Sequence, residues 1–479
     1  MKNPICHSPY AASPHAAVLA ALVALVALAL ALFSVTTHAA DYSWKSAGNS
    51  TYTTAGNWLA DGVDATQAPH TKSENNIVTP TAYGEVLLNG ENYRVNNFNV
   101  TLTSNWLWRG PAGGDGSLYI DGTLAKAGSA ALTFTNNSNN DTNIVQLGIN
   151  RLDVQAGVLN FGRTRKGQRY QLASITVTGA TTISTGATLN INSPAATFAE
   201  ITLDNNATLN ILQGHDVSAA TTLYTGGITT KGLSGSGGLV QARDGYDIVP
   251  GTAEAFTSAR AATGTLIISN ATEGEVFSFG GVIADGGTGS TLALTKKGAS
   301  TQILAGTNTW TGGTNVEGGT LIVSGSLAAT GTLDVSAAAT FLTANKLTVG
   351  NTTLADGAIL GFDLDATSGA SLIIDGNLTL AGAFVIDFGG TGIEGQTYAN
   401  LFSVTGTGAD VGIISFINFG IDNVSGQLAA SQLADNFTIG GLVPEPATVA
   451  LVTGLLTTFA VIANRRRRNR RALQPVAAH

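Results

Sequence analysis

Short apolar runs alternate with turns rich in glycine, threonine and asparagine over residues 41–443. In the clearest stretch, Gly280–Leu327, Leu292 and Leu294 alternate with small residues. A period of two places successive side chains on opposite faces of a strand, so this pattern predicts strands that bury one face. Gly312-Gly313 falls where the chain must turn, because glycine reaches positive φ without a steric cost.

A short phrase, Thr-Leu followed by any residue and then an aliphatic one, recurs along the chain. The step from its copy at Thr188–Ile191 to its copy at Thr208–Ile211 has the length of one modest solenoid coil. Stacking of these coils would place Asn190 over Asn210. Further copies occur at Thr265–Ile268, Thr291–Leu294, Thr320–Val323 and Thr332–Val335. The spacing between these later copies is irregular, so loops must vary between coils.

The stretch Gly280–Leu327 resembles the autotransporter-associated β-strand repeat of bacterial surface proteins. The matching residues are Gly281-Val282-Ile283, Leu304–Thr314, Val316 and Gly319-Thr320-Leu321. The resemblance covers about a tenth of the chain and implies one or two coils of a right-handed parallel β-helix. The expected fold class is therefore all-β, a right-handed parallel β-helix or solenoid.

Four of the five tryptophans lie early in the chain, at positions 44, 58, 106 and 108. An open solenoid end exposes apolar edges, and bulky aromatic side chains can cover it. We therefore interpret residues 41–110 as an N-terminal capping region. An alternative is that Trp106 and Trp108, which flank Leu107 on one strand, form an exposed platform that contacts a glycan.

Charge is sparse and unevenly distributed. Only 11% of residues are charged. Of the 31 acidic and 23 basic residues, one acidic residue and six arginines follow Pro444, and one lysine lies in the first forty residues. Residues 41–443 thus carry 30 acidic and 16 basic residues, a balance of −14. This acidic balance argues against nucleic acid as a partner, because phosphate binding needs basic surfaces.

Residues 1–40 predict a signal helix for export. The continuous apolar run Ala16–Phe33 is followed by small residues, and cleavage by signal peptidase is expected after Ala39 or Ala40. An uncleaved transmembrane anchor is the alternative. The only cysteine, Cys6, precedes the apolar run, so the mature chain is expected to have no disulfide.

Residues 444–471 carry a second specific pattern. The motif Pro444, Glu445, Pro446 precedes an apolar run, Ala447–Ala463, that predicts a single transmembrane helix. A basic cluster follows, which the positive-inside rule predicts to stay on the cytoplasmic side of the membrane: Arg465, Arg466, Arg467 and Arg468. This order resembles the PEP-CTERM sorting signal of Gram-negative bacteria, which implies recognition of the Pro-Glu-Pro motif by an exosortase. A tail, 472–479, follows. A plain C-terminal anchor is the alternative.

Residues suited to catalysis are few. Residues 41–443 contain two histidines, His70 and His215, and no cysteine, which argues against a zinc site or a Ser-His-Asp triad. Asp363 and Asp365 lie two apart on an expected strand and could share a face, as in a polysaccharide lyase or glycoside hydrolase. We expect no enzyme activity, no catalytic residue, no metal and no cofactor, and keep this pair as the enzymatic alternative.

Together these patterns predict an exported, non-catalytic protein of the cell surface or extracellular matrix. Its solenoid, residues 111–443 with the autotransporter-type repeat at 280–327, would be structural or adhesive and associated with exopolysaccharide. Gly232–Gly238 predicts a turn or hinge within it. The C-terminal helix would hold the chain transiently in the inner membrane. A carbohydrate-binding module is a second alternative.

Overall fold

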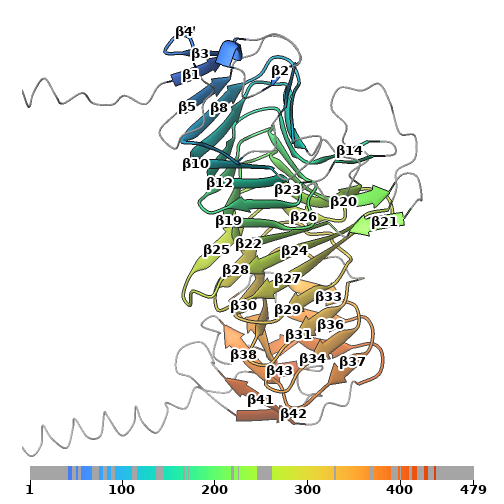
Figure 1. Cartoon of the computed structure of the whole chain (residues 1–479). Helices are drawn as coiled ribbons and strands as arrows, with labels where there is room; N and C mark the ends of the chain where they lie inside the picture. The colour runs from blue at the N-terminus through green and yellow to red at the C-terminus, as the bar shows by residue number, and fades with distance from the viewer. Residues whose placement is uncertain are drawn as a thin grey trace, which may run out of the picture.

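The computed structural model describes an elongated column of β-strands (Figure 1). The described residues lie within 41–438. They exclude 46–49, 52–54, 67–74, 79–83, 88–91, 111–115, 136–144, 166–167, 171, 217–220, 225, 245–260, 328–330, 366–369, 390–396, 400, 409–412, 418–425 and 430–435. The one helical turn among the described residues is the 3-10 turn η1, Ala55–Asn57. The expectation of an all-β fold is confirmed.

The coils of the column pair in parallel along three sides, because most coils contribute a strand to each side. Side one runs from β7 (Asn92–Val95) to β37 (Leu378–Leu380). Its other strands are β10 (Gly116–Ala127), β12 (Val145–Val154), β16 (Ser174–Val177), β19 (Ala196–Leu203), β22 (Gly226–Ser234), β24 (Thr263–Ser269), β27 (Thr291–Lys297), β29 (Thr314–Val316), β31 (Leu333–Val335) and β34 (Thr352–Leu354).

Side two contains the second halves of β10, β12, β19 and β22, which pair separately from the first halves. Its other strands are β5 (Asn75–Val78), β8 (Asn97–Thr101), β17 (Thr181–Ile183), β25 (Val276–Phe279), β28 (Thr301–Leu304), β30 (Thr320–Val323), β32 (Thr340–Thr343), β35 (Ile359–Asp363), β38 (Val385–Gly389) and β41 (Ile413–Ile417). A parallel bridge from Gly235 to Phe279 continues this side from β22 to β25.

Side three consists of two parallel sheets. The N-terminal sheet contains β2 (Ser50–Thr51), β6 (Gly84–Leu87), β9 (Trp106–Arg109), β11 (Ala131–Thr135), β13 (Val158–Phe161), β18 (Thr188–Ile191), β20 (Thr208–Asp216), β23 (Leu239–Asp244) and β26 (Val282–Ala284). The C-terminal sheet contains β33 (Lys346–Val349), β36 (Ser371–Ile374) and β40 (Phe402–Val404). Between the two sheets, the described residues of the coils of β27–β28 and β29–β30 contribute only isolated bridges to side three.

Antiparallel strands cover both ends of this parallel stack. At the N-terminal end, β1 (Asp41–Trp44) pairs in parallel with β5 but antiparallel with β3 (Trp58–Ala60), and β4 (Val63–Asp64) follows β3. At the other end, β42 (Gly426–Ala429) lies antiparallel to β41. Two further antiparallel pairs are β39 (Thr397–Ala399) with β43 (Asn436–Thr438) and β20 with β21 (Thr221–Tyr224). A sheet edge that is already paired is a poor template for another chain.

The register of the coils confirms the stacking predicted from the first two copies of the repeated phrase. Asn190 pairs with Asn210, and Leu189 pairs with Leu209. The later copies do not follow one face. The phrase at Thr320–Val323 lies in side two, whereas the phrase at Thr332–Val335 overlaps β31 of side one. The step between these two copies is shorter than a coil, so they belong to consecutive strands of one coil.

The core lies inside the column and is built from the alternate residues of each strand. On β27, every second residue (Leu292, Leu294 and Lys296) is buried. Towards the N-terminus the core becomes aromatic. The rings of Trp44 and Trp58 meet edge-on, with centroids 4.8 Å apart. The early tryptophans are therefore part of the core.

A row of amide side chains runs along side three on the face opposite to the core. Leu189 and Ile191 belong to the core, so alternation directs Asn190 to the other face. The Asn190 amide donates to Asn160 Oδ1 (2.7 Å), and the Asn210 amide donates to Asn190 Oδ1 (2.6 Å). The row continues from Asn160 to Thr133 Oγ1 (2.9 Å) and from Gln241 to Asn210 Oδ1 (2.8 Å). Because Asn160, Asn190 and Asn210 are buried, these bonds are shielded from water.

Two lysines occupy core positions that are aliphatic in the neighbouring coils. Lys126 is fully buried between Val100 and Val154. Its ammonium donates to the carbonyl oxygens of Gly128 and Ala156, both at 2.7 Å. Since Ala156 lies in the next coil, this lysine ties two successive turns together.

Lys296 repeats this arrangement far along the column. It is fully buried and donates to the carbonyl oxygens of Lys297 (2.9 Å), Gly298 (3.1 Å) and, in the next coil, Gly318 (3.2 Å). Burial lowers the pKa of Lys296, and that of Lys126, to about 8. The carbonyl acceptors favour the charged form and act against this shift.

A buried glutamine side chain satisfies backbone hydrogen-bonding groups where side two passes from β22 to β25. Gln302 accepts a hydrogen bond from Leu233 N–H (3.0 Å) and donates one to Leu233 C=O (2.9 Å), as a neighbouring strand would. The predicted turn or hinge at Gly232–Gly238 is narrower than expected, since β22 continues through Ser234, Gly235 (φ 124°) still bridges Phe279, and the bend follows at Ser236-Gly237.

Loss of one amide from the row should destabilise the column. We expect Asn190→Ala to lower the free energy of unfolding by about 1–3 kcal/mol for each buried partner left unsatisfied. Thr353→Ala, at an exposed position of side one, is the control. Urea unfolding followed by circular dichroism measures both. Equal midpoints for the two variants would contradict a stabilising role for the row.

The buried lysines should make stability depend on alkaline pH. Their pKa of about 8 in the folded chain lies below the usual unfolded value of roughly 10.4, so the unfolded state binds more protons between these pH values. The free energy of unfolding should therefore rise as pH increases from about 8 to about 10. Comparison with the Lys126→Met/Lys296→Met variant isolates this contribution from tyrosine titration. If the free energy of unfolding of the variant had the same pH dependence as that of the wild type, the prediction would be wrong.

Candidate functional site

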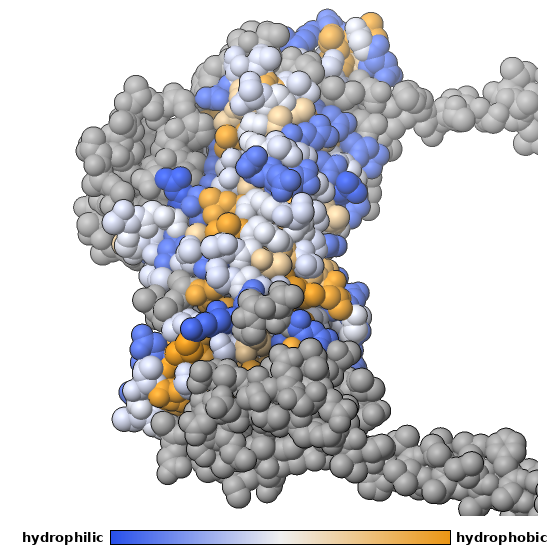
Figure 2. All heavy atoms as spheres, turned by 180° about the vertical axis from the view of Figure 1, so that it is seen from behind, coloured by the Kyte–Doolittle hydropathy of each residue, from blue (hydrophilic) through white to orange (hydrophobic). Residues whose placement is uncertain are grey.

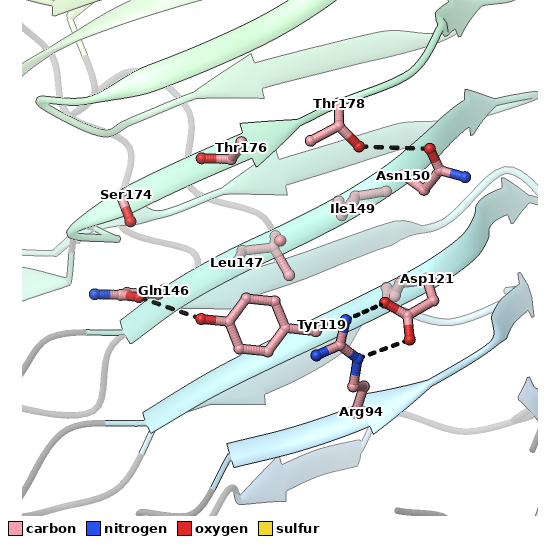
Figure 3. A pocket seen from close by; sticks show the side chains of 12 residues that line it. Arg94, Tyr119, Asp121, Gln146, Leu147, Ile149, Asn150, Ser174, Thr176 and Thr178 are labelled. Atoms are coloured by element: carbon pink, nitrogen blue, oxygen red, sulfur yellow. Dashed lines mark hydrogen bonds and ion pairs between the residues drawn. The ribbon is translucent and has the colours of Figure 1, made fainter. Parts of the chain in front are cut away.

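A groove of about 460 Å³, lined by both polar and apolar residues, lies on the outer face of side one. Four neighbouring strands, β7, β10, β12 and β16, supply its residues, together with Thr178 directly after β16 (Figure 3). The outward orientation follows from alternation, because Leu118 and Ile120 are buried on either side of Tyr119. The groove therefore forms because successive coils place their outward-facing residues side by side.

The aromatic ring of Tyr119 lies across the neighbouring strand. Tyr119 pairs in register with Gly148 of β12. A Cβ atom at Gly148 would lie only 2.5 Å from Tyr119 Cδ1, so the ring occupies the space that any other side chain would need. Figure 3 shows the ring broadside over the strand, with its hydroxyl near Gln146 Oε1 at 3.5 Å. The Cδ1–Cε1 edge of the ring lies against Gly148, and one ring face points out of the groove (Figure 3).

An ion pair closes one end of the groove. Arg94 Nε and Nη2 donate to the two carboxylate oxygens of Asp121 at 2.7 and 2.8 Å. The Arg94 guanidinium carbon also lies 5.6 Å from the centre of the Tyr119 ring, within the range of a cation–π contact. The hydrogen bond to Asp121 raises the pKa of Arg94 above its usual value. The fork geometry fixes both side chains.

The other end of the groove is uncharged. Thr178 Oγ1 lies 3.4 Å from Asn150 Oδ1 (Figure 3). Ser174 and Thr176 of β16, the strand that leads to Thr178, also line this end. Amides and hydroxyls both donate and accept hydrogen bonds, so this wall suits a ligand rich in hydroxyl groups. The single carboxylate of the groove, Asp121, is engaged by Arg94. The arrangement supports stacking and hydrogen bonding.

The structure corrects the glycan-platform interpretation of Trp106 and Trp108. Both side chains are nearly inaccessible, with exposed fractions of 2% and 1%. Trp106 packs edge-on against Trp44 (5.6 Å between centroids), and Trp108 packs against Phe98 (4.8 Å). Stacking on a sugar needs an exposed ring face, so these two residues belong to the core.

The premise for a carboxylate pair at Asp363 and Asp365 is wrong. Asp363 ends β35, whereas Asp365 lies in the following turn, so the two do not share a strand face. The Asp363 Oδ1 atom instead accepts the Asp365 N–H at 3.1 Å, which is an Asx-type turn. Among the described residues, no three His, Cys, Asp or Glu side chains gather as a metal site would require.

The predicted sorting and cleavage residues lie outside the described residues. These are Ala39, Ala40, Pro444, Glu445, Pro446, Arg465, Arg466, Arg467 and Arg468. The signal helix and the C-terminal helix therefore remain predictions. Among the residues that the structure describes, we find no helix of the length and apolarity that crossing a bilayer requires. His70 is also outside the described residues, and the backbone of His215 pairs with Thr222.

Sequence reasoning missed Tyr119 as a candidate site residue. The available signal was a large aromatic residue between two core positions, followed by Gly148 between the core residues Leu147 and Ile149. A glycine within a strand marks a place where another group approaches closely. The sequence does not show which residues of successive strands pair. Because coil lengths vary, Tyr119 and Gly148 could not be assigned to paired positions.

Residues 294–323 match the passenger-associated transport repeat family. No curated protein and no solved structure matches the chain. The matched segment includes the Asn308–Thr314 motif, whose polar residues join adjacent parts of the column. Asn308 Oδ1 accepts Ile283 N–H (3.1 Å), and the Trp310 indole donates to Thr314 Oγ1 (3.0 Å). The matched segment thus spans one coil and part of the next, from Leu294 through its partner Thr314 to β30.

The burial of the tryptophans gives a simple test of the corrected core. All five indoles are at most 6% exposed. We expect acrylamide to quench their fluorescence several-fold less in the native chain than in the urea-unfolded chain. Free tryptophan amide serves as the accessible reference. Native quenching close to that of the unfolded chain would show that the indole faces are open to solvent.

Proposed function

We propose that this chain is an exported, non-catalytic β-solenoid protein that serves a structural or adhesive role at the cell surface or in the extracellular matrix. The observation that carries the proposal is the parallel column together with its passenger-associated transport repeat. That repeat indicates an exported cell-surface or secreted protein. Exopolysaccharide is the proposed matrix component with which it associates.

The shape suits a spacer. The twelve strands of side one, at about 4.8 Å between neighbouring strands, give a column on the order of 50 Å long. Neighbouring coils are joined by backbone ladders, by the amide row and by the two buried lysines, so the column resists bending. Such an element can hold a terminal or lateral binding surface away from the cell.

The surface supports a soluble, extracellular element. Figure 2 shows one face of the column covered largely by residues of intermediate hydropathy, with polar and apolar residues scattered among them. Val63 and Val276 are the large aliphatic residues that stand most exposed among the described residues, at 68% and 60%. Scattered exposed apolar residues are normal on a soluble surface.

The proposed route of export uses both terminal segments. Signal peptidase would cut after Ala39 or Ala40, and an exosortase would recognise Pro444, Glu445 and Pro446 before removing the C-terminal helix. The support is the resemblance of this motif, apolar run and arginine cluster to the PEP-CTERM signal. In this proposal the chain is held in the inner membrane only transiently.

Fractionation of native host cells tests location and sorting together. We expect the wild-type chain in the surface or matrix fraction, with a mass that lacks residues 465–471. Replacement of Pro444, Glu445 and Pro446 by alanine should leave a chain that retains this arginine tail in the inner membrane fraction. Thr353→Ala is the matched control.

Two outcomes contradict different parts of the proposal. A cytoplasmic wild-type chain would overturn export and the surface role. Retention of the arginine tail by both the wild type and the alanine variant would overturn exosortase processing while leaving export intact. Immunodetection with an antibody raised against residues 41–438, followed by intact-mass analysis, distinguishes these results.

A further inference from the structure

We infer that the groove around Tyr119 is a binding subsite for a neutral polysaccharide, with one sugar ring stacked on the outward face of the tyrosine ring. This inference deepens the proposed function and rests on it for the biological source of the polysaccharide. Its physical basis is the groove itself, which combines a fixed aromatic surface, a wall of uncharged polar groups and a neutralised ion pair.

The Tyr119 ring is already held in the orientation that a sugar would need. One edge of the ring lies against Gly148, the Arg94 guanidinium carbon lies 5.6 Å from the ring centre, and Gln146 lies 3.5 Å from the hydroxyl. A side chain that is ordered before binding loses little conformational entropy when the ligand arrives. Tyr119 is half-buried, so part of its surface remains accessible.

The groups around the ring match the two kinds of surface on a sugar. The C–H bonds on one face of a pyranose pack on the electron-rich face of an aromatic ring, while its hydroxyls point outward around the rim. Gln146, Asn150, Thr176 and Thr178 line the groove on one side of the ring with donors and acceptors (Figure 3). A ligand site typically combines such an apolar platform with a few placed polar groups.

Charge selects for a neutral ligand. Arg94 and Asp121 form a bidentate pair at 2.7 and 2.8 Å, so their charges cancel within the groove. The remaining polar residues of the groove carry no charge. The balance of −14 over residues 41–443 further repels a polyuronate or a nucleic acid. A polysaccharide without ionised groups avoids this repulsion.

The pairing of the strands that follow the groove leaves a polar surface over which a polymer can extend. Gly148 pairs with Thr176, which pairs with Thr197, which in turn pairs with Thr229. Thr176 and Thr197 are exposed, so hydroxyl groups continue along the outer face of side one at the roughly 4.8 Å spacing of paired strands. A chain of sugars that lies on Tyr119 can therefore extend over the following coils.

A purely structural role for Tyr119 makes a different prediction, because an aromatic ring can simply cover a glycine in a strand. The column contains a second such pair that separates the two roles. A Cβ atom at Gly232 would lie 2.2 Å from the ring of Phe277, so Phe277 covers this glycine in the same way. Phe277 has no place in the described groove, which makes Phe277→Ala a matched control.

The experiment measures binding of the full chain to defined polymers. Affinity electrophoresis in gels that contain dextran, pullulan, hydroxyethyl cellulose or polygalacturonate gives the dissociation constants. We expect at least one neutral polymer to retard the wild type and polygalacturonate not to do so. Tyr119→Ala should weaken binding at least tenfold, whereas Tyr119→Phe should stay within about threefold. Gly148→Val, which displaces the ring, should resemble Tyr119→Ala.

Several results would overturn the inference. These are unchanged binding by Tyr119→Ala, tighter binding of polygalacturonate than of every neutral polymer, and no retardation by any neutral polymer. An equal loss of binding in Tyr119→Ala and Phe277→Ala would assign the effect to the fold. In each case the location of Tyr119→Ala in host cell fractions still tests the proposed function separately, since export does not depend on this groove.

Discussion

The in-register pairing of successive coils is the constraint on which the rest of the structure depends. Each coil must place an apolar residue over an apolar residue of its neighbour, because the core is a continuous stack inside the column. Polar groups that enter this stack need partners in the adjacent coil. Lys126 and Lys296 obtain them from backbone carbonyl groups, and Gln302 from the backbone of Phe277 and, one coil further, Leu233. On the opposite face, Asn190 obtains its partners from identical side chains. The same rule therefore governs both faces of a strand.

Much of this arrangement could be predicted from the sequence, because alternation and identical phrases are local signals. The strand class and the step from Asn190 to Asn210 follow from them. The assignment of later phrases to sides could not be predicted, since intervening loops change the coil length. The coil that joins Leu294 to its partner Thr314 is shorter than the coil that joins Leu266 to Leu294. Periodicity identifies a strand and does not say which neighbour it meets.

The candidate site shows the same limit more sharply. Trp106 and Tyr119 are both aromatic residues on strands, and sequence reasoning considered only the tryptophan as a glycan contact. Their side chains point to opposite sides of the column wall, and only the position of core residues such as Leu118 and Ile120 reveals this. The partner that gives Tyr119 its geometry, Gly148, lies a whole coil further along the chain. A site formed by residues of successive coils can be identified only when the pairing of those coils is known.

The coil-by-coil construction also sets how the column responds to force. Strands run across the long axis, so tension between the two ends is borne by one row of inter-coil hydrogen bonds at a time. The terminal coil must detach before the next is loaded, and each freed coil supplies up to about 70 Å of extended chain if it is as short as the step from Asn190 to Asn210. The column is therefore stiff under small loads and lengthens stepwise under large ones. Lys126 and Lys296, which each bridge two coils, are where such lengthening would pause.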